Sequence, residues 1–161
     1  MRGDAEIITL LNEQLTSELT AISQYFLHAK MLQNWGWTEL AEGFRKASMG
    51  EMKDTEEVID RILFLEGLPN YQRLGTLRIG QTVREQLEAD LAIELAVVER
   101  LRPGIALCRD KGDITTANLF EEILADEEHH IDYLETQLSL LDGIGEQLYL
   151  AGQIEHPTGG D

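Results

Sequence analysis

The chain has 161 residues, enough to bury the core of one domain, and 43% of them are hydrophobic and 27% charged. Its formal net charge of −17 argues against nucleic acid and anionic membranes as partners, because both bind concentrated positive charge. The only cysteine, Cys108, excludes an internal disulfide framework and a cysteine-based zinc site, so a reducing cytoplasm is the expected location. The first residues do not resemble a signal peptide, and no apolar run reaches the roughly 18 residues that span a bilayer.

Helical periodicity runs through four long stretches and one short one. They cover about 4–34, 38–65, 82–111, 114–142 and 146–153. Thr82 followed by Glu85 has the form of a capping box, and Asp113 is placed to cap the next helix. We therefore predict one helical domain at 1–153 and a flexible tail at 154–161.

The lengths of the connections predict how these helices associate. Short links join the first to the second and the third to the fourth, so each pair is antiparallel. A connection of roughly 15 residues separates the two pairs, which lets them pack with one long crossover. The predicted fold class is all-α: a four-helix bundle with one long crossover connection and a short fifth helix at the C-terminus.

The apolar face of each long helix is interrupted by one glutamate. These residues are Glu18, Glu51, Glu94 and Glu127, each within about a turn of its helix midpoint. A single such glutamate more often turns outward or meets an arginine. Four at one level of a bundle would cost several kcal/mol each and repel one another without a partner. Their coincidence favours a pair of bound divalent cations.

The fourth helix also offers a nitrogen ligand. Glu127 and His130 are spaced i, i+3, so a carboxylate and an imidazole on one face can bind one metal. Two such pairs, with single glutamates from the other two helices, form the ligand set known from di-iron carboxylate bundles. Oxygen and nitrogen ligands without thiolate suit iron or manganese, and zinc is an alternative occupant.

Three segments around these positions, 17–28, 61–70 and 126–137, together with the opening Met-x-Gly-Asp, resemble the bacterioferritins. The resemblance covers nearly the whole chain and implies a ferritin-like bundle in a cytoplasmic shell of 24 subunits. It further implies a di-iron site that oxidises Fe(II) with O2 or H2O2, a stored ferric mineral and a ferredoxin-type electron donor. Glu51 and Glu127 would bridge two irons, and Glu18, Glu94 and His130 would be terminal ligands. Met52 would bind haem b at a twofold subunit interface.

Position 54 departs from the family pattern, which has Glu-x-x-His on the second helix where this chain reads Glu51-Met52-Lys53-Asp54. An aspartate oxygen is as many bonds from the backbone as the δ nitrogen of histidine, so Asp54 stays a candidate ligand. It adds one negative charge, however, and we expect the site to favour Fe(III) and to release it more slowly. Lys46 and Gly50 also replace residues that often bind iron on the inner surface of the shell.

These departures leave an alternative open. The chain would then be the haem-bearing subunit of a mixed shell, with an impaired ferroxidase centre. Two other classes rank lower: rubrerythrin-like oxidases carry a cysteine module that one cysteine cannot supply, and mini-ferritins lack the fifth helix. We expect His28 and His129 to be exposed or at interfaces, and Tyr25 either to pack in the core or to reach the metal ligands.

Overall fold

The computed structural model describes residues 1–154, and all of its regular secondary structure in that range is helical. The helices are α1 (Ala5–Trp35), α2 (Thr38–Phe64), α3 (Val83–Asp110), α4 (Ile114–Ile144) and α5 (Glu146–Ala151). Each begins and ends within two residues of its predicted bound, so the predicted fold class is confirmed. Of the predicted tail, 155–161 lie outside the described residues.

Local side-chain caps explain where the second helix pair begins. The Thr82 hydroxyl accepts a hydrogen bond from the backbone N–H of Glu85 at 3.2 Å, as the capping-box pattern predicts. The Glu85 carboxylate reaches back to the N–H of Gln81, one residue before the cap, at 2.7 Å. Asp113 caps α4 by accepting from the N–H of Thr116 at 3.0 Å. Polar residues in the connections therefore set the helix starts.

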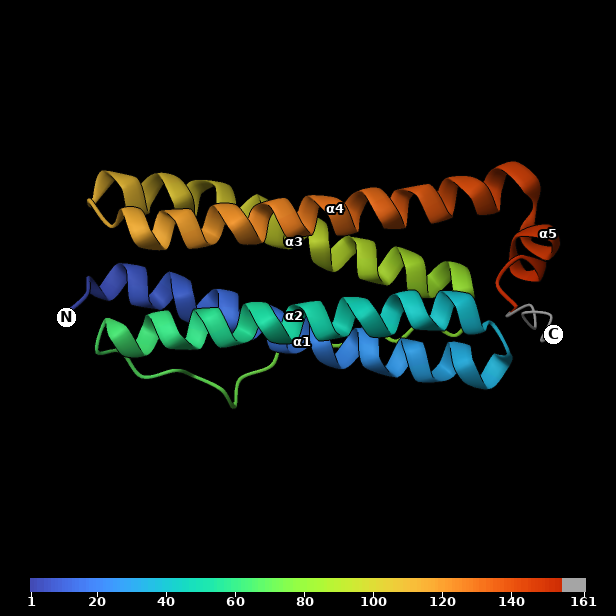
Figure 1. Ribbon diagram of the computed structural model, residues 1–161, viewed down its shortest axis with the longest axis horizontal. Helices are drawn as coiled ribbons and strands as arrows, with labels where there is room; N and C mark the ends of the chain where they lie inside the picture. Colours follow the sequence, from blue (N-terminus) through green and yellow to red (C-terminus); the bar gives the residue numbers. More distant parts are fainter. Residues whose placement is uncertain (155–161) are drawn as a thin grey trace, which may run out of the picture.

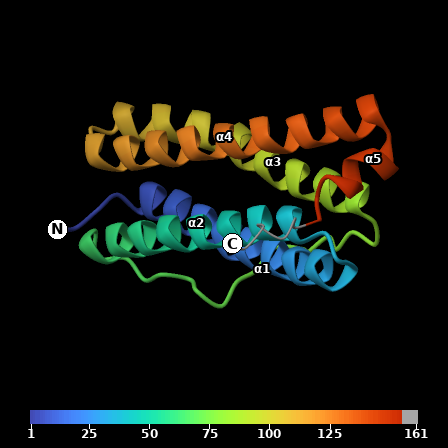
Figure 2. The ribbon, with the colours of Figure 1, turned by 45° about the vertical axis from the view of Figure 1, so that its right-hand side comes forward.

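The long helices pack as two antiparallel pairs, α1 with α2 and α3 with α4, and the pairs lie face to face (Figures 1 and 2). The connection between α2 and α3 runs along the outside of the α1–α2 pair and carries the chain back to the other end (Figure 1). Helix α3 continues through Pro103. This topology brings the middle of all four long helices to the same level.

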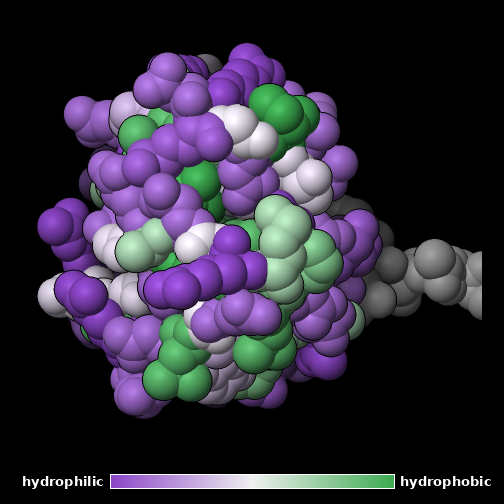
Figure 3. All heavy atoms as spheres, turned by 90° about the vertical axis from the view of Figure 1, so that its left-hand side faces the viewer, coloured by the Kyte–Doolittle hydropathy of each residue, from purple (hydrophilic) through white to green (hydrophobic). Residues whose placement is uncertain are grey.

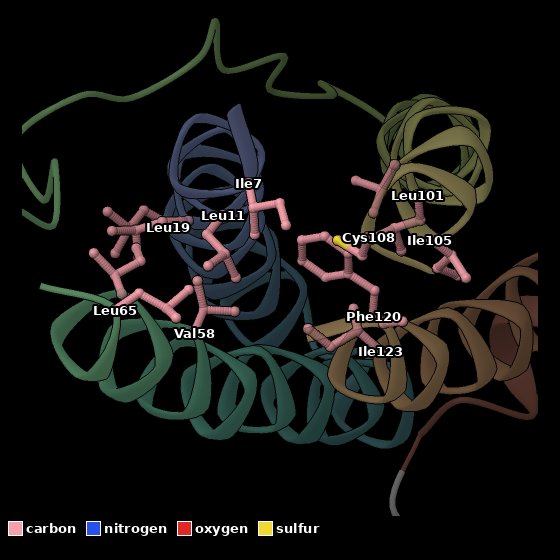
Figure 4. Close-up of a cluster of buried hydrophobic side chains, with 14 residues drawn as sticks. Ile7, Leu11, Leu19, Val58, Leu65, Leu101, Ile105, Cys108, Phe120 and Ile123 are labelled. Atoms are coloured by element: carbon pink, nitrogen blue, oxygen red, sulfur yellow. The ribbon is translucent and has the colours of Figure 1, made fainter. Parts of the chain in front are cut away.

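Two separate apolar clusters fill the bundle, one on each side of that level. The larger cluster joins the first half of α1 and α4 to the second half of α2 and α3, with Leu11, Val58 and Phe120 among its buried members (Figure 4). The smaller cluster fills the other end, where Leu32, Leu40 and Leu87 are buried close to α5. Buried apolar area of this kind is the main source of stability in a helical bundle. The polar centre between the clusters depends on that stability.

His28 is fully buried, so the expectation that it is exposed or at an interface was wrong. Its Nδ1 lies 3.0 Å from an Asp90 carboxylate oxygen that also accepts from Gln24 at 2.7 Å. On its other side, the N–H of Gly80 donates to His28 Nε2 at 3.0 Å, and the N–H of Arg78 donates to the Gln24 amide oxygen. Buried polar groups of α1 and α3 thus hold the end of the crossover, a role that the periodicity of α1 alone did not reveal. His129 is exposed, as predicted.

Large apolar side chains are exposed at the end of the bundle that carries the N-terminus. Leu63 and Phe64 at the end of α2 and Ile114 at the start of α4 are each about half exposed or more. Viewed from this end, hydrophobic patches lie among hydrophilic side chains (Figure 3). None of the helices in the described residues combines the length and the hydrophobicity that crossing a bilayer requires. Exposed apolar patches of this kind are typical of contacts between protein subunits.

Candidate metal centre

The four predicted glutamates meet between the two apolar clusters, and each is 1% exposed. Glu18 comes from α1, Glu51 from α2, Glu94 from α3 and Glu127 from α4. Asp54, one turn beyond Glu51, is 5% exposed. Each helix contributes its carboxylate at the point where its apolar face is interrupted, as the sequence pattern predicts.

The ligand atoms form two overlapping groups, each with its members within 4.8 Å of one another. One group consists of Glu51, Glu94, Glu127 and His130, and the other of Glu18, Glu51, Asp54 and Glu127. Glu51 and Glu127 belong to both groups. Glu94 and His130 complete one group, and Glu18 and Asp54 complete the other. This is the geometry of two neighbouring cation sites that share two carboxylates.

His130 lies directly against the shared carboxylates. Its Nδ1 is 3.2 Å from Glu51 Oε1, 3.7 Å from Glu127 Oε2 and 3.8 Å from Glu94 Oε1. The two longer contacts exceed hydrogen-bond distance and the shortest lacks hydrogen-bond geometry, so His130 Nδ1 is buried without a hydrogen-bond partner. A nitrogen that is surrounded by carboxylate oxygens and bonded to none of them is placed to share a cation with them.

The carboxylates also carry oxygens without partners. Five carboxylate oxygens in the bundle interior are buried and accept no hydrogen bond: Glu18 Oε2, Glu51 Oε1, Glu94 Oε2, Glu127 Oε2 and Asp90 Oδ2. Four of the five belong to the two ligand groups. A buried oxygen without a donor is costly, and a bound cation removes that cost. Oxygen donors with one imidazole and no thiolate fit Fe(II), so the residues present suit a pair of iron ions.

Burial and crowding shift the protonation of the metal-free centre. Burial raises the pKa of Glu18 to about 8, and burial followed by the charge of Glu18 holds the pKa of Glu51 well above its usual range. Burial and the nearby Asp126 raise the pKa of Asp54 to about 7. For His130 burial lowers the pKa, but Glu127 and the other carboxylates outweigh it and raise the pKa overall. The centre therefore retains protons that cations would displace.

Two outer contacts hold the terminal carboxylates. The Tyr25 hydroxyl donates to Glu94, so the alternative in which Tyr25 reaches the ligands is confirmed. On the opposite side, Gln14 donates to Glu18, and Arg100 donates to Gln14. This second contact was not predicted from the sequence. Gln14 precedes Glu18 by four residues, and this spacing, which places both on one face of α1, could have predicted their contact. Arg100 lies beside the apolar face of α3, and no spacing in the sequence indicates its contact with Gln14.

Met52, the predicted haem ligand, lies outside the carboxylate groups and is 44% exposed on α2. Phe26 of α1 and Met49 of α2 are also exposed. Leu19 of α1 is instead buried in the larger apolar cluster. The side chain of Met52 is therefore accessible in the single subunit, and Met49, three residues before it, lies on the same face of α2.

A four-helix bundle with one long crossover and inward-facing carboxylates and histidine is the arrangement of ferritin-like proteins. The family model described as a ferritin-like domain matches residues 8–144. The bacterioferritins of Mycolicibacterium paratuberculosis and Mycobacterium bovis are 66% and 64% identical to this chain over 157 residues, covering 98% of it and 99% of each relative. A solved structure of Mycobacterium tuberculosis bacterioferritin, BfrA, superposes with a TM-score of 0.96 at 64% identity, covering 98% of this chain and 99% of that one.

With such similarity over almost its entire length, the chain belongs to the bacterioferritin family. Membership supports a role in iron storage and implies ferroxidase activity in general. The relatives also suggest that the subunit assembles into an oligomeric shell. The resemblance of the three sequence segments is thereby confirmed.

Proposed function

We propose that this subunit stores iron in a cytoplasmic shell of 24 copies and oxidises Fe(II) at the carboxylate centre on the way in. The observation that carries the proposal is the sharing of Glu51 and Glu127 between two ligand groups. Two cations held by shared carboxylates lie close enough to act on one oxidant. Two Fe(II) ions supply two electrons that, together with two protons, reduce O2 to H2O2 or H2O2 to two water molecules, and both ions become Fe(III).

The residues of the chain have separate tasks in this proposal. Glu51 and Glu127 bridge the two ions, while Glu94 with His130 and Glu18 with Asp54 complete the two sites. The two apolar clusters exclude bulk water from both ends of the centre. The Tyr25 hydroxyl orients Glu94 by donating to it.

The stopped-flow rate of Fe(II) oxidation by the assembled protein tests this function. We expect a fast phase that saturates near two Fe(II) per subunit. A rate that rises in proportion to added Fe(II), with no saturable phase, would contradict a di-iron ferroxidase site.

Asp54 supports a second candidate function, a haem-bearing subunit with an impaired ferroxidase centre in a mixed shell. Its carboxylate lies with the ligand oxygens of Glu18, Glu51 and Glu127, so it can still reach a cation. Two Fe(II) ions with five carboxylates leave one net negative charge, which stabilises Fe(III) and slows its release. We favour a complete but slower centre, because the oxygen of Asp54 occupies a ligand position.

Replacing Asp54 with histidine should speed release from the centre and raise the turnover of Fe(II) oxidation roughly tenfold. The physical reason is the removal of the surplus negative charge at a ligand position. Multiple-turnover oxidation of sequential Fe(II) additions measures it. Lys53→His, which places a histidine on the exposed neighbouring position, is the matched control and should leave turnover unchanged. Equal rates for wild type and Asp54→His would remove the slow-centre interpretation.

We also propose that Met52 binds haem b together with one methionine of a second subunit, because Met52 is exposed and shares its face of α2 with the apolar Met49. Bound haem would supply an electron path for releasing stored iron, with a ferredoxin-type protein as the donor. Reconstitution with haemin should give a Soret band of low-spin, methionine-ligated haem. Met52→Leu should lose that spectrum, whereas Met49→Leu, the same substitution at a more exposed position of α2, should keep it. An unchanged Soret band in Met52→Leu would rule out this ligand.

A further inference from the structure

Arg100 lies against the Glu18 side of the carboxylate centre. Its Nη2 donates to the amide oxygen of Gln14 at 2.9 Å and to the hydroxyl of Ser17 at 2.7 Å. The amide nitrogen of Gln14 then donates to Glu18 Oε1 at 2.6 Å. Gln14 and Glu18 are both buried, and Arg100 is partly buried. A guanidinium is thus joined to a carboxylate of the centre through a single amide.

The chemistry of the three groups allows only one direction for this chain of hydrogen bonds. Arginine has donors and no acceptor, and an ionised carboxylate has acceptors and no donor. The Gln14 amide must therefore turn its oxygen to Arg100 and its nitrogen to Glu18. This hydrogen bond engages Glu18 Oε1 and leaves Oε2, which has no hydrogen-bond partner, as the oxygen free to bind a metal.

Among the described residues, Arg100 has no direct carboxylate partner. Within residues 1–154 no Asp or Glu oxygen lies within the 4.0 Å of an ion pair from its guanidinium. Burial lowers the pKa of Arg100, while the charges of Glu13 and Glu18 raise it. A partly buried cation without a direct partner loses hydration free energy, and negative charge nearby offsets that loss.

The two sides of the centre differ in charge. On one side Glu94 is paired with the neutral ligand His130 and accepts from the neutral Tyr25 hydroxyl. On the other side Glu18 is paired with Asp54, a second carboxylate. Five carboxylates with two divalent cations leave one negative charge among the ligands, and the positive charge of Arg100, which lies outside the ligand groups, offsets part of it. The Arg100 guanidinium lies on the Glu18 side of the centre, which has the additional carboxylate.

We propose that Arg100, acting through Gln14, is a positioning residue that orients Glu18 and compensates the negative charge that Asp54 brings to the centre. The inference rests on the proposed function, because it requires the centre to bind two divalent cations. It concerns metal affinity and ligand geometry, which can be measured without turnover.

Titration of the metal-free assembled protein with Co(II), followed by visible absorption, tests the proposal. Arg100→Met should weaken Co(II) binding by roughly 10- to 100-fold and shift the absorption bands, because the Glu18 carboxylate is released. Arg100→Lys, which keeps the charge, should retain most of the affinity. Arg102→Met removes the same charge from an exposed position two residues away and should bind Co(II) like wild type.

The proposal would be overturned if Arg100→Met had the same Co(II) affinity and the same absorption bands as wild type. An equal weakening in Arg102→Met would overturn it as well, because the effect would then belong to net charge alone. Wild type that binds no pair of Co(II) ions would instead contradict the proposed metal centre. Size exclusion separates these results from misassembly, and Arg100→Gln serves as the neutral variant should Arg100→Met not assemble.

A double-mutant comparison tests the charge compensation directly. In the Asp54→Asn background the surplus negative charge is gone, so Arg100→Met should weaken Co(II) binding less than it does in wild type. An equal weakening of Co(II) binding in both backgrounds would show that Arg100 does not compensate the charge of Asp54.

Discussion

Replacing Glu127 with glutamine should abolish the fast, saturable oxidation of Fe(II), with a loss of rate on the order of 100-fold or more. Glu127 belongs to both ligand groups, so one substitution removes a shared ligand from both cation sites. Glutamine has nearly the same shape as glutamate but offers one neutral oxygen in place of a charged pair. Stopped-flow oxidation measures the rate, and Co(II) titration should show that paired binding is lost.

The control for this prediction is the adjacent Glu128→Gln, which removes the same charge from an exposed side chain of α4. It should oxidise Fe(II) like wild type. The helices of Glu127→Gln should remain folded, because neutralising a buried carboxylate in the metal-free bundle relieves repulsion. A fast phase of normal amplitude in Glu127→Gln would mean that oxidation takes place elsewhere on the subunit.

The metal-free protein should lose stability as the pH rises from about 4 to 8. Burial raises the pKa of Glu18 from 4.5 to about 8 and that of Asp54 from 3.8 to about 7, so both hold protons in the folded state that the unfolded chain has released. Groups with a raised folded pKa stabilise the fold below their unfolded pKa, and this contribution is lost as the pH passes through the folded pKa. Each such group contributes a slope on the order of 1 kcal/mol per pH unit within its window.

Thermal unfolding of the metal-free protein at constant protein concentration and ionic strength measures this slope. Glu18→Gln cannot release a proton and should flatten it, whereas Glu135→Gln, an exposed change on α4, should leave it as in wild type. Adding Co(II) at pH 8 should restore more stability than at pH 5, because cations replace the protons of the carboxylates. Stability that is constant or that rises between pH 4 and 8 would show that the carboxylates are solvated or paired in the metal-free state.

The pattern of apolar and polar residues in the sequence was sufficient to predict the helices and most of the carboxylate centre. The apolar periodicity predicted all five helices, and the polar residues Thr82 and Asp113 predicted where two of them begin. Four glutamates on apolar faces and the i, i+3 pair Glu127 and His130 predicted a convergent cluster, and the structure brings them together. These features are local, or they depend only on helices of similar length lying side by side. They can therefore be predicted from the sequence.

What the tertiary structure decided depends on how the helices are rotated and shifted against one another. Only that arrangement places Glu51 and Glu127 in both ligand groups and brings Asp54 to the Glu18 side. It also buries His28 against Asp90 and directs Arg100 of α3 through Gln14 of α1 to the centre, although 86 residues separate them in the chain. A helical pattern defines the face on which a side chain lies but not its neighbour on the next helix, because packing of the apolar clusters sets the register between helices.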